Sequence, residues 1–471
     1  MMNEQNEMVG TVIEYDDAVL TEKGQMRVLI ALPASDELSR ASFLAMIAGD
    51  YRPLNAQELD IPPWIHLDVD YPPIGIGAIG GHLFEADAFS ALTSRDFVVR
   101  CDIPEVQLED VFSHFGEERV FSDPDIGAFA VCKEDPAIGA TADVQANLAV
   151  INLWANGMDG NRTAIAILDS GINRTHLIAR GVEAKIDPTV YWRRPGAATP
   201  DPGLHQIGHG TMCAYDAAIV APGATLLDYP ILGPGPLSSS QMGGALSNAL
   251  SAYAHLLSWW AVAFGPSRNN YDALVLSNSW GMYHPDWDFR PGHPGRYLDN
   301  MSHPFNQIVA SLSSANVDIL FAAGNCGSYC PDPRCQGNAT NSIMGANAHP
   351  QVICVGGVDV KGNWAGYSSE GPAVFGMDQN KPDIVAFTHF DGSRVYTGLP
   401  DSGTSAACPV AAGCVAALRT AIGQLSTPPA ELASILESTA RKSGQGVSWD
   451  RRLGCGIIDP VSAGRLVGAI P

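Results

Sequence analysis

Residues 402–413 of this 471-residue chain read SGTSAACPVAAG. Small, turn-forming residues run directly into an alanine-rich apolar segment, so we expect Ser405 in the first turn of a buried helix. A helix N-terminus offers unpaired N–H groups and a partial positive charge, which favour an anion that develops beside the hydroxyl. A serine at this place is either a nucleophile or an ordinary helix cap. A nucleophile also requires a base and a group that orients the base.

The chain around this stretch alternates strand-like and helix-like segments from about residue 144. Short apolar runs without polar alternation are typical of strands buried on both faces, and they lie at 164–168, 225–232, 273–276, 319–323 and 352–358. Helix-like segments lie between them, at 209–220, 240–264, 300–315 and 404–421. This order predicts an α/β fold for residues 144–471, with a doubly wound, mostly parallel sheet.

Residues 1–135 have a different pattern, which predicts a smaller N-terminal α+β module without an obvious reactive group. Strands are expected at 26–32, 64–69 and 97–101, helices at 41–48 and 104–115, a loop at 71–81, and extended chain at 120–131, broken at Pro124. Residues 136–143 are predicted to be a linker.

Polar residues follow the predicted strands at the edge where a doubly wound sheet collects its functional groups. Asp169 ends the first strand, His209 stands between two glycines at a helix start, and Asn325 follows the strand that ends at residue 323. Each alone is compatible with turn or structural roles. Together with Ser405 they supply an acid, a base, an amide donor and a nucleophile, with the acid first, the base second and the nucleophile last in the chain.

Four sequence motifs carrying these residues resemble those of the subtilisin-like serine proteases, the subtilase family. The motifs are AIAILDSGI at 164–172, HGT at 209–211, AAGN at 322–325 and GTSAACP at 403–409. The resemblance covers roughly residues 140–465 and implies a serine endopeptidase that hydrolyses peptide bonds through an acyl-enzyme.

The resemblance also implies a role for each motif residue. Ser405 would attack the scissile carbonyl, and His209 would act as general base and then as general acid. Asp169 would hold the imidazole, and Asn325, with the Ser405 N–H, would stabilise the oxyanion.

The substrate site is likewise implied by the resemblance. An extended peptide would pair with the strand at 275–281, and two walls would flank the substrate residue before the cut. One wall would be Ser279, Trp280 and Gly281, and the other Ala322, Ala323 and Gly324. Residues 338–349 should approach the pocket floor and contain no Asp or Glu, which favours a neutral or apolar substrate residue.

Some positions depart from the family pattern. Residues 173–176 read NRTH and offer no carboxylate where the family often binds calcium, so we expect no metal there and no cofactor. Met212 and Cys213 stand where a second histidine is usual, but neither position is required by the chemistry.

Two interpretations of residues 1–135 stay open. Their order of elements is loosely similar to that of family propeptides, which occupy the active site. The module is longer than such a propeptide needs, and its acidic residues 105–118 could equally serve a regulatory partner.

Composition narrows the classes of partner and location. Asp and Glu outnumber Lys and Arg by 50 to 27, and the net charge of −23 disfavours nucleic acid and anionic membranes. A polypeptide substrate is the expected partner. Residues 1–7 lack the features of a secretory signal, and the apolar stretch 250–264 is too short to span a bilayer. We therefore expect a soluble cytoplasmic protein.

Three of the ten cysteines fall within ten residues, Cys326, Cys330 and Cys335. They could hold a disulfide, for which Cys330 with Cys335 is the preferred pairing, or three ligands of a metal. In a reducing compartment, three free thiols would fit the sequence as well as a disulfide or a metal site.

Two other functions compete with proteolysis. A catalytically silent subtilase could act as a binding or scaffold protein. An esterase of the α/β-hydrolase type is disfavoured, because it requires the order Ser, acid, His and a G-x-S-x-G motif at the nucleophile.

Overall fold

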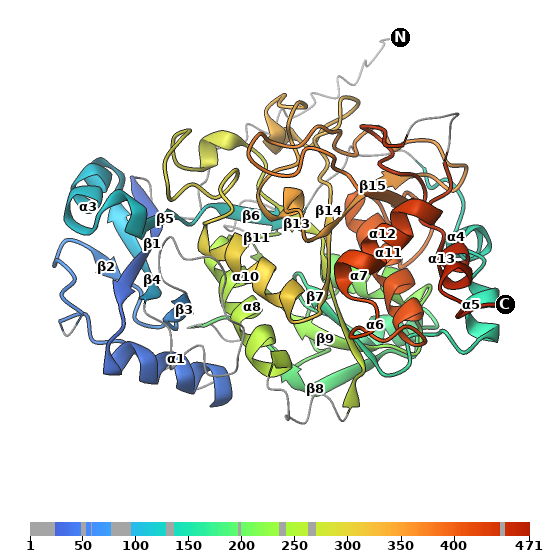
Figure 1. The fold of residues 1–471 in the computed structure, drawn as a ribbon, viewed down its shortest axis with the longest axis horizontal. Coiled ribbons are helices and arrows are strands. Elements are labelled where there is room, and N and C mark those ends of the chain that lie inside the picture. Colours follow the sequence, from blue (N-terminus) through green and yellow to red (C-terminus); the bar gives the residue numbers. More distant parts are fainter. Residues whose placement is uncertain are drawn as a thin grey trace, which may run out of the picture.

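A seven-stranded sheet with parallel neighbours forms the centre of the larger part of the chain (Figure 1). The computed structural model describes residues 24–48, 53–57, 59–76, 96–128, 136–195, 199–234, 242–261, 270–442 and 448–471. In spatial order the strands are β16 (Ile384–Phe387), β15 (Ile353–Val358), β14 (Asp318–Ala322), β12 (Ala273–Asn278), β7 (Thr163–Leu168), β9 (Thr225–Tyr229) and β8 (Lys185–Tyr191). The predicted doubly wound parallel sheet is confirmed, and β8 and β16 are additions to the five predicted strands.

Both faces of this sheet are covered by helices. On one face, Ile165 and Ile167 of β7 share a core with α7 (His209–Ala218) and α11 (Thr404–Arg419). On the other face, Ala164, Ala166 and Leu168 pack in a core with α8 (Leu246–Ala261) and α10 (Pro304–Ser314). Because successive residues of β7 face different apolar cores, the strand has no polar alternation.

Shorter helices complete the larger part of the chain. They are α4 (Thr141–Asn147), α5 (Val150–Ala155), α6 (Arg174–Ala179), α12 (Pro429–Thr439) and α13 (Pro460–Leu466). The first of them begins within the segment predicted as a linker. None of the helices in the described part of the chain combines the length and the apolar character that a membrane-spanning segment needs.

The N-terminal module, drawn in blue to cyan in Figure 1, is built on a separate antiparallel sheet. Its strands are β1 (Gln25–Pro33), β2 (His66–Leu67), β3 (Ile74–Ile76), β4 (Asp96–Pro104) and β5 (Val120–Ser122), and its helices are α1 (Asp36–Ala48) and α3 (Leu108–Phe115). The loop predicted over 71–81 is wrong where β3 forms. Ile74 and Ile76 are buried against β4, so tertiary pairing overrides the Gly and Pro content of that segment. Residues 77–81 and 129–131, which the loop and extended-chain predictions include, lie outside the described residues.

A third sheet joins the module to the rest of the chain. Its order is β10 (Gly233–Pro234), β11 (Met242–Ala245), β6 (Asp125–Ala128) and β13 (Trp280–Gly281). The central strand β6 belongs to the module and lies antiparallel between β11 and β13, as Figure 1 shows beside the main sheet. The module thus adds a strand to the part of the chain that carries the predicted substrate-binding residues.

Residues of the module also bind the N-terminus of α8. The Ser247 N–H donates to Asp123 Oδ1 at 2.7 Å, and the Leu246 N–H donates to the Pro124 carbonyl at 3.0 Å. The Tyr71 hydroxyl donates to the Ser247 carbonyl at 2.9 Å. The first N–H groups of a helix have no partner within the helix, so the module satisfies donors that would otherwise need water.

Candidate active site

Asp169 and His209 form a buried hydrogen-bonded pair. Asp169 directly follows β7, and His209 is the first residue of α7. His209 Nδ1 lies 2.9 Å from both carboxylate oxygens of Asp169, and the two side chains are 7% and 1% exposed. His209 Nε2 has no hydrogen-bond partner among the described residues. The carboxylate therefore assigns the proton to Nδ1 and leaves Nε2 as the basic nitrogen.

The glycine after His209 permits this approach. A Cβ atom at Gly210 would lie 2.6 Å from the Gly171 carbonyl oxygen and 3.2 Å from Asp169 Cβ. Any side chain there would separate the start of α7 from the turn after β7. The His-Gly pair in the sequence is thus explained by the close contact of these two elements.

Ser405 is the second residue of α11, as the sequence predicts, and it is buried. Gly403 precedes the helix with a φ of 79°, a conformation that favours glycine. The Ser405 hydroxyl donates to the Ser279 carbonyl at 3.4 Å, and the Ser279 hydroxyl donates to the Ser405 carbonyl at 3.0 Å. Ser405 and the predicted substrate wall at Ser279 are therefore in contact.

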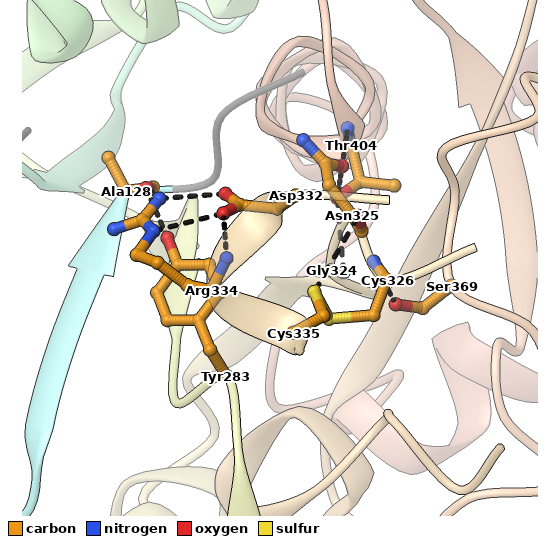
Figure 2. Close-up of a disulfide and its surroundings, with 10 residues drawn as sticks. All are labelled: Ala128, Tyr283, Gly324, Asn325, Cys326, Asp332, Arg334, Cys335, Ser369 and Thr404. Carbon is orange, nitrogen blue, oxygen red and sulfur yellow. Dashed lines mark hydrogen bonds and ion pairs between the residues drawn. A yellow bond between two sulfur atoms is a disulfide. The ribbon is translucent and has the colours of Figure 1, made fainter. Parts of the chain in front are cut away.

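Asn325 lies just beyond β14, and its amide is oriented by Thr404, the neighbour of Ser405 (Figure 2). Asn325 Oδ1 accepts from the Thr404 N–H at 2.9 Å and from the Thr404 hydroxyl at 3.0 Å. A backbone N–H can only donate, so the atom that faces it must be the amide oxygen. The other end of the side chain is consequently the NH₂ donor.

The two predicted substrate walls are joined by a residue that the sequence analysis missed. Asn347 Nδ2 donates to the Trp280 carbonyl at 3.0 Å and to the Ala322 carbonyl at 2.8 Å. The Trp280 ring contacts Phe305 and Phe321, so this wall residue offers its backbone to the site while its side chain belongs to the core. The predicted wall residues all lie at the carboxyl ends of the adjacent strands β12 and β14, namely Ser279, Trp280, Gly281, Ala322, Ala323 and Gly324.

Cys213 is a second residue whose contact with the site the sequence analysis missed. Its sulfur lies 3.6 Å from Asp169 Oδ2, 3.7 Å from His209 Nδ1 and 3.5 Å from the Ser405 carbonyl oxygen. It follows His209 by one helical turn, and that spacing is the signal that could have found it. Asp169, His209 and Cys213 form the one group of metal-ligand side chains found in the described part of the chain. Burial raises the pKa of the Cys213 thiol well above its usual value, which disfavours the thiolate that a metal would need.

The buried carboxyl group of Asp228, near the end of β9, lies close to the Asp169–His209 pair. Asp228 Oδ2 accepts from the Gly203 N–H at 2.9 Å and from the Ile172 N–H at 3.3 Å. Burial, with a smaller contribution from the Asp169 charge, raises the pKa of Asp228 to about 7 against the lowering effect of the two N–H donors. Asp228 is thus largely protonated in mildly acidic solution, which avoids a second buried negative charge near Asp169.

The preferred cysteine pairing, Cys330 with Cys335, is wrong. The structure joins Cys326 to Cys335, with their Cα atoms 5.7 Å apart (Figure 2). Asp332 caps the short 3₁₀ turn Pro333–Cys335, and the Cys335 N–H donates to the Asp332 carbonyl at 3.0 Å. This turn directs Cys335 back towards Cys326. Cys330 is disulfide-bonded as well, so all three sulfurs are oxidised, and the alternatives of a three-cysteine metal site and of free thiols are also wrong.

Comparison with known proteins identifies the family to which these residues belong. The model of the subtilase family matches residues 160–456, which include Asp169, His209, Asn325 and Ser405. The chain belongs to the subtilase family.

This subtilase is similar to much longer proteases. It is 28% identical over 305 residues to the subtilisin-like protease SBT6.1 of Arabidopsis thaliana, which covers 62% of this chain and 25% of that protein. It is 29% identical over 301 residues to the human membrane-bound transcription factor site-1 protease, with coverage of 62% and 24%. Bacillopeptidase F of Bacillus subtilis is 25% identical over 333 residues, with coverage of 66% and 21%. The match therefore spans about a quarter or less of each relative.

Proposed function

We propose that this subtilase is a serine endopeptidase with Ser405 as nucleophile, His209 as general base and acid, Asp169 as the group that orients the base, and Asn325 as oxyanion donor. The observation that carries the proposal is the buried Asp169–His209 pair, in which Nδ1 is bound at 2.9 Å and Nε2 has no partner among the described residues. A neutral imidazole held in this tautomer is the form that can accept a proton from a serine.

The chemical steps follow from these groups. The Ser405 hydroxyl turns from the Ser279 carbonyl to His209 Nε2, gives up its proton there, and its oxygen attacks the substrate carbonyl carbon. The negative charge on the tetrahedral intermediate is stabilised by the Asn325 NH₂ and by the Ser405 N–H at the start of α11. His209 then protonates the leaving amine, and water hydrolyses the acyl-enzyme by the same route.

We further propose that substrates bind as the strand between β11 and β13. Both strands are rich in glycine and offer backbone groups on opposite sides of one extended segment. A peptide in this place gains main-chain hydrogen bonds on both sides, which carry little sequence preference. The expectation of a polypeptide substrate rests on this arrangement and on the family.

The N-terminal module acts, in this proposal, as an inhibitory prodomain-like element. Its strand β6 takes the place between β11 and β13 that the substrate would need. Its residues Asp123 and Pro124 also bind the N-terminus of α8, which holds the module beside the site. A regulatory partner could act by displacing the module.

A fluorophosphonate probe tests the nucleophile. The native full chain should be labelled, and Ser405→Ala should not. Denatured casein, followed by mass spectrometry of the fragments, then distinguishes a protease from an esterase. If the native chain is not labelled even after the module is released, the catalytically silent alternative is the better description.

A cut placed in the chain after folding tests the module. A recognition site for an unrelated protease is inserted between residues 128 and 136, the folded protein is cut there, and the turnover of a peptide substrate is compared before and after the cut. Release of the module should raise turnover. Equal turnover before and after release would contradict an inhibitory role, and the same cut in Ser405→Ala gives the background.

The cytoplasmic location stays a prediction. Disulfides such as Cys326–Cys335 are more frequent in oxidising compartments than in the cytosol, so the test must cover both locations. Cell fractionation with thiol labelling of the chain would decide between them.

A further inference from the structure

The loop closed by the Cys326–Cys335 disulfide carries an arginine that contacts the strand in the substrate site. Arg334 Nη2 donates to the Ala128 carbonyl at 2.7 Å. The Tyr283 hydroxyl donates to the same carbonyl oxygen. Figure 2 shows the two side chains converging on Ala128, the last residue of β6. None of the family motifs contains either residue.

Arg334 is held rigidly in this position. Its guanidinium forms two hydrogen bonds with the buried Asp332 carboxylate, from Nε to Oδ1 at 3.1 Å and from Nη2 to Oδ2 at 2.8 Å. Its Cζ atom also lies 3.7 Å from the centroid of the Tyr283 ring. The fork geometry and the ring contact fix the direction of the guanidinium before anything binds to it.

The loop itself is anchored next to the predicted oxyanion donor. The Asp332 N–H donates to the Asn325 carbonyl at 2.8 Å, and the disulfide begins at Cys326, the next residue. The Cys326 N–H in turn donates to the Ser369 hydroxyl at 3.0 Å. Arg334 is therefore connected through two short links to the segment that carries Asn325 (Figure 2).

The strand register relates Ala128 to the nucleophile. Ala128 pairs with Trp280, and β6 runs antiparallel to β13. In a peptide bound in the same register, the residue that follows the Ala128 position lies opposite Ser279, whose carbonyl accepts from the Ser405 hydroxyl. The carbonyl held by Arg334 and Tyr283 is thus one residue before the one that faces Ser405.

The same two side chains restrict the preceding position of the strand. A Cβ atom at Gly127 would lie 2.9 Å from Arg334 Nη1, 2.9 Å from the Met242 carbonyl oxygen and 3.5 Å from the Tyr283 ring. The Met242 oxygen is a backbone atom and cannot rotate away. A residue other than glycine at this position would have to displace the arginine or widen the site.

We propose that Arg334 and Tyr283 form a carbonyl clamp that positions the substrate main chain and selects glycine at the position occupied by Gly127. The inference rests on the proposed function, because it assigns to a substrate the place that β6 takes. The two donors hold the carbonyl of the residue before the one that faces Ser405, and the crowding at Gly127 adds a preference that backbone pairing alone lacks.

The test uses peptides that copy residues 125–129, Asp-Ile-Gly-Ala-Phe, followed by a fluorogenic amine. One peptide is unmodified, one has a thioamide in place of the Ala carbonyl, and one has Ala in place of Gly. Rates are measured with the folded chain after the module has been released by the cut between residues 128 and 136, so that β6 does not compete with the peptide, and they are expressed per active site titrated with a fluorophosphonate. Because the titrant is small and does not form the strand, it separates the clamp from the reacting groups.

In the native chain, kcat/KM should fall about 10- to 100-fold for the thioamide peptide, as expected when a hydrogen bond from a charged donor is weakened. In Arg334→Ala, kcat/KM for the unmodified peptide should fall by a similar factor, and the thioamide should then cause little further loss. Titration by the fluorophosphonate should keep its native rate. Equal thioamide effects in native and variant chains would overturn the clamp and leave the proposed function standing.

A second variant guards against misfolding of the first. Tyr283→Phe keeps the ring beneath the guanidinium and removes only the hydroxyl, and it should lower kcat/KM for the unmodified peptide about 3- to 10-fold. Arg162→Ala, which breaks an exposed pair with Asp272, is the matched control and should change neither rate. If the Gly and Ala peptides are cut at the same rate, the glycine preference is wrong. No titratable site in the native chain would overturn the proposed function and this inference with it.

Discussion

Gly413 is the position at which a single methyl group should separate the two helices that carry the catalytic candidates. It lies in α11, eight residues after Ser405, and a Cβ atom there would be 2.3 Å from the carbonyl oxygen of Ala217 and 3.3 Å from Val220 Cβ. Ala217 in turn lies eight residues after His209 in α7. The contact is therefore about 12 Å along each helix from its reactive residue, at 1.5 Å per residue.

The expected cost of Gly413→Ala combines two opposing effects. Overpacking a tight contact costs roughly 1–3 kcal/mol, and we take the upper end because the opposing atom is backbone. Alanine in place of glycine in a helix stabilises the folded chain by up to about 1 kcal/mol. We therefore expect a net loss of about 2 kcal/mol in the free energy of unfolding. The helices must move apart by about 1 Å to restore a normal contact, and a displacement of that size between reacting groups can cost about 100-fold in rate.

Two assays separate these effects. Urea unfolding, carried out in a Ser405→Ala background to avoid self-digestion, measures stability, and peptide hydrolysis per titrated site measures rate. Gly423→Ala is the control, because the nearest atom to its Cβ is the Ser426 hydroxyl oxygen at 3.3 Å, which can rotate. Native stability and native turnover in Gly413→Ala would refute the argument that close packing of α7 and α11 sets the geometry of the site.

Three further predictions concern other parts of the same core. Asn325→Ala should lower kcat by roughly 100- to 1000-fold with KM little changed, a magnitude measured for the corresponding donor in subtilisin. Arg419→Met should cost about 3–5 kcal/mol of stability in urea, because it leaves the fully buried Asp318 carboxylate without the guanidinium that binds both its oxygens, at 2.6 and 2.7 Å; an unchanged urea midpoint would contradict this. Asp228→Asn should gain stability relative to the native chain as pH rises. The pKa of Asp228 is about 7 in the folded chain, against an ordinary value of 3.8. The free energy of unfolding of the native chain therefore falls by roughly 4 kcal/mol between pH 4 and pH 8, and Asp228→Asn lacks this loss. Parallel pH profiles for the two proteins would refute that assignment.

The sequence predicted those elements in which a buried apolar segment is closely followed by a polar residue. The segments 164–168 and 319–323 are short, apolar and followed by Asp169 and Asn325, and they are β7 and β14 with nearly the same bounds. The helix expected over 404–421 is α11. In these places hydrophobic pattern, turn residues and functional motif agree, so local and global preferences lead to the same structure.

The strands that were missed lack such agreement. The segment of β8, Lys185–Tyr191, contains Pro188 and four polar or charged side chains, and it lies at the edge of the sheet, where proline is tolerated. The segment of β16 is only four residues long and follows Pro382. Neither stretch carries a pattern that distinguishes it from a loop, and each is extended because a neighbouring strand pairs with it.

The sequence predicted residues for the walls of the substrate site, and it did not predict the strand that lies beside them. The motif resemblance pointed to Ser279, Trp280 and Gly281, because these residues closely follow a strand that can be recognised in the sequence. The pairing of β6 with β11 could not be foreseen, since the sequences DIGA and MGGA have little strand preference and are separated by more than a hundred residues. Contacts between such distant segments depend on the whole fold, which a local pattern does not encode.

The glycine content of these paired strands has a physical consequence for recognition. Between β11 and β13, Gly243, Gly244 and Gly281 let a peptide backbone approach closely, but this place offers few side chains that could discriminate between sequences. Discrimination must then come from side chains that reach the peptide from outside the paired strands. Arg334 and Tyr283 meet that requirement at the Ala128 carbonyl and at Gly127. Arg334 lies beyond the AAGN motif, in a loop fixed by a disulfide. The family motifs therefore supply only the proposed reacting groups of this subtilase, and the folded loop adds the residues proposed to contact the peptide.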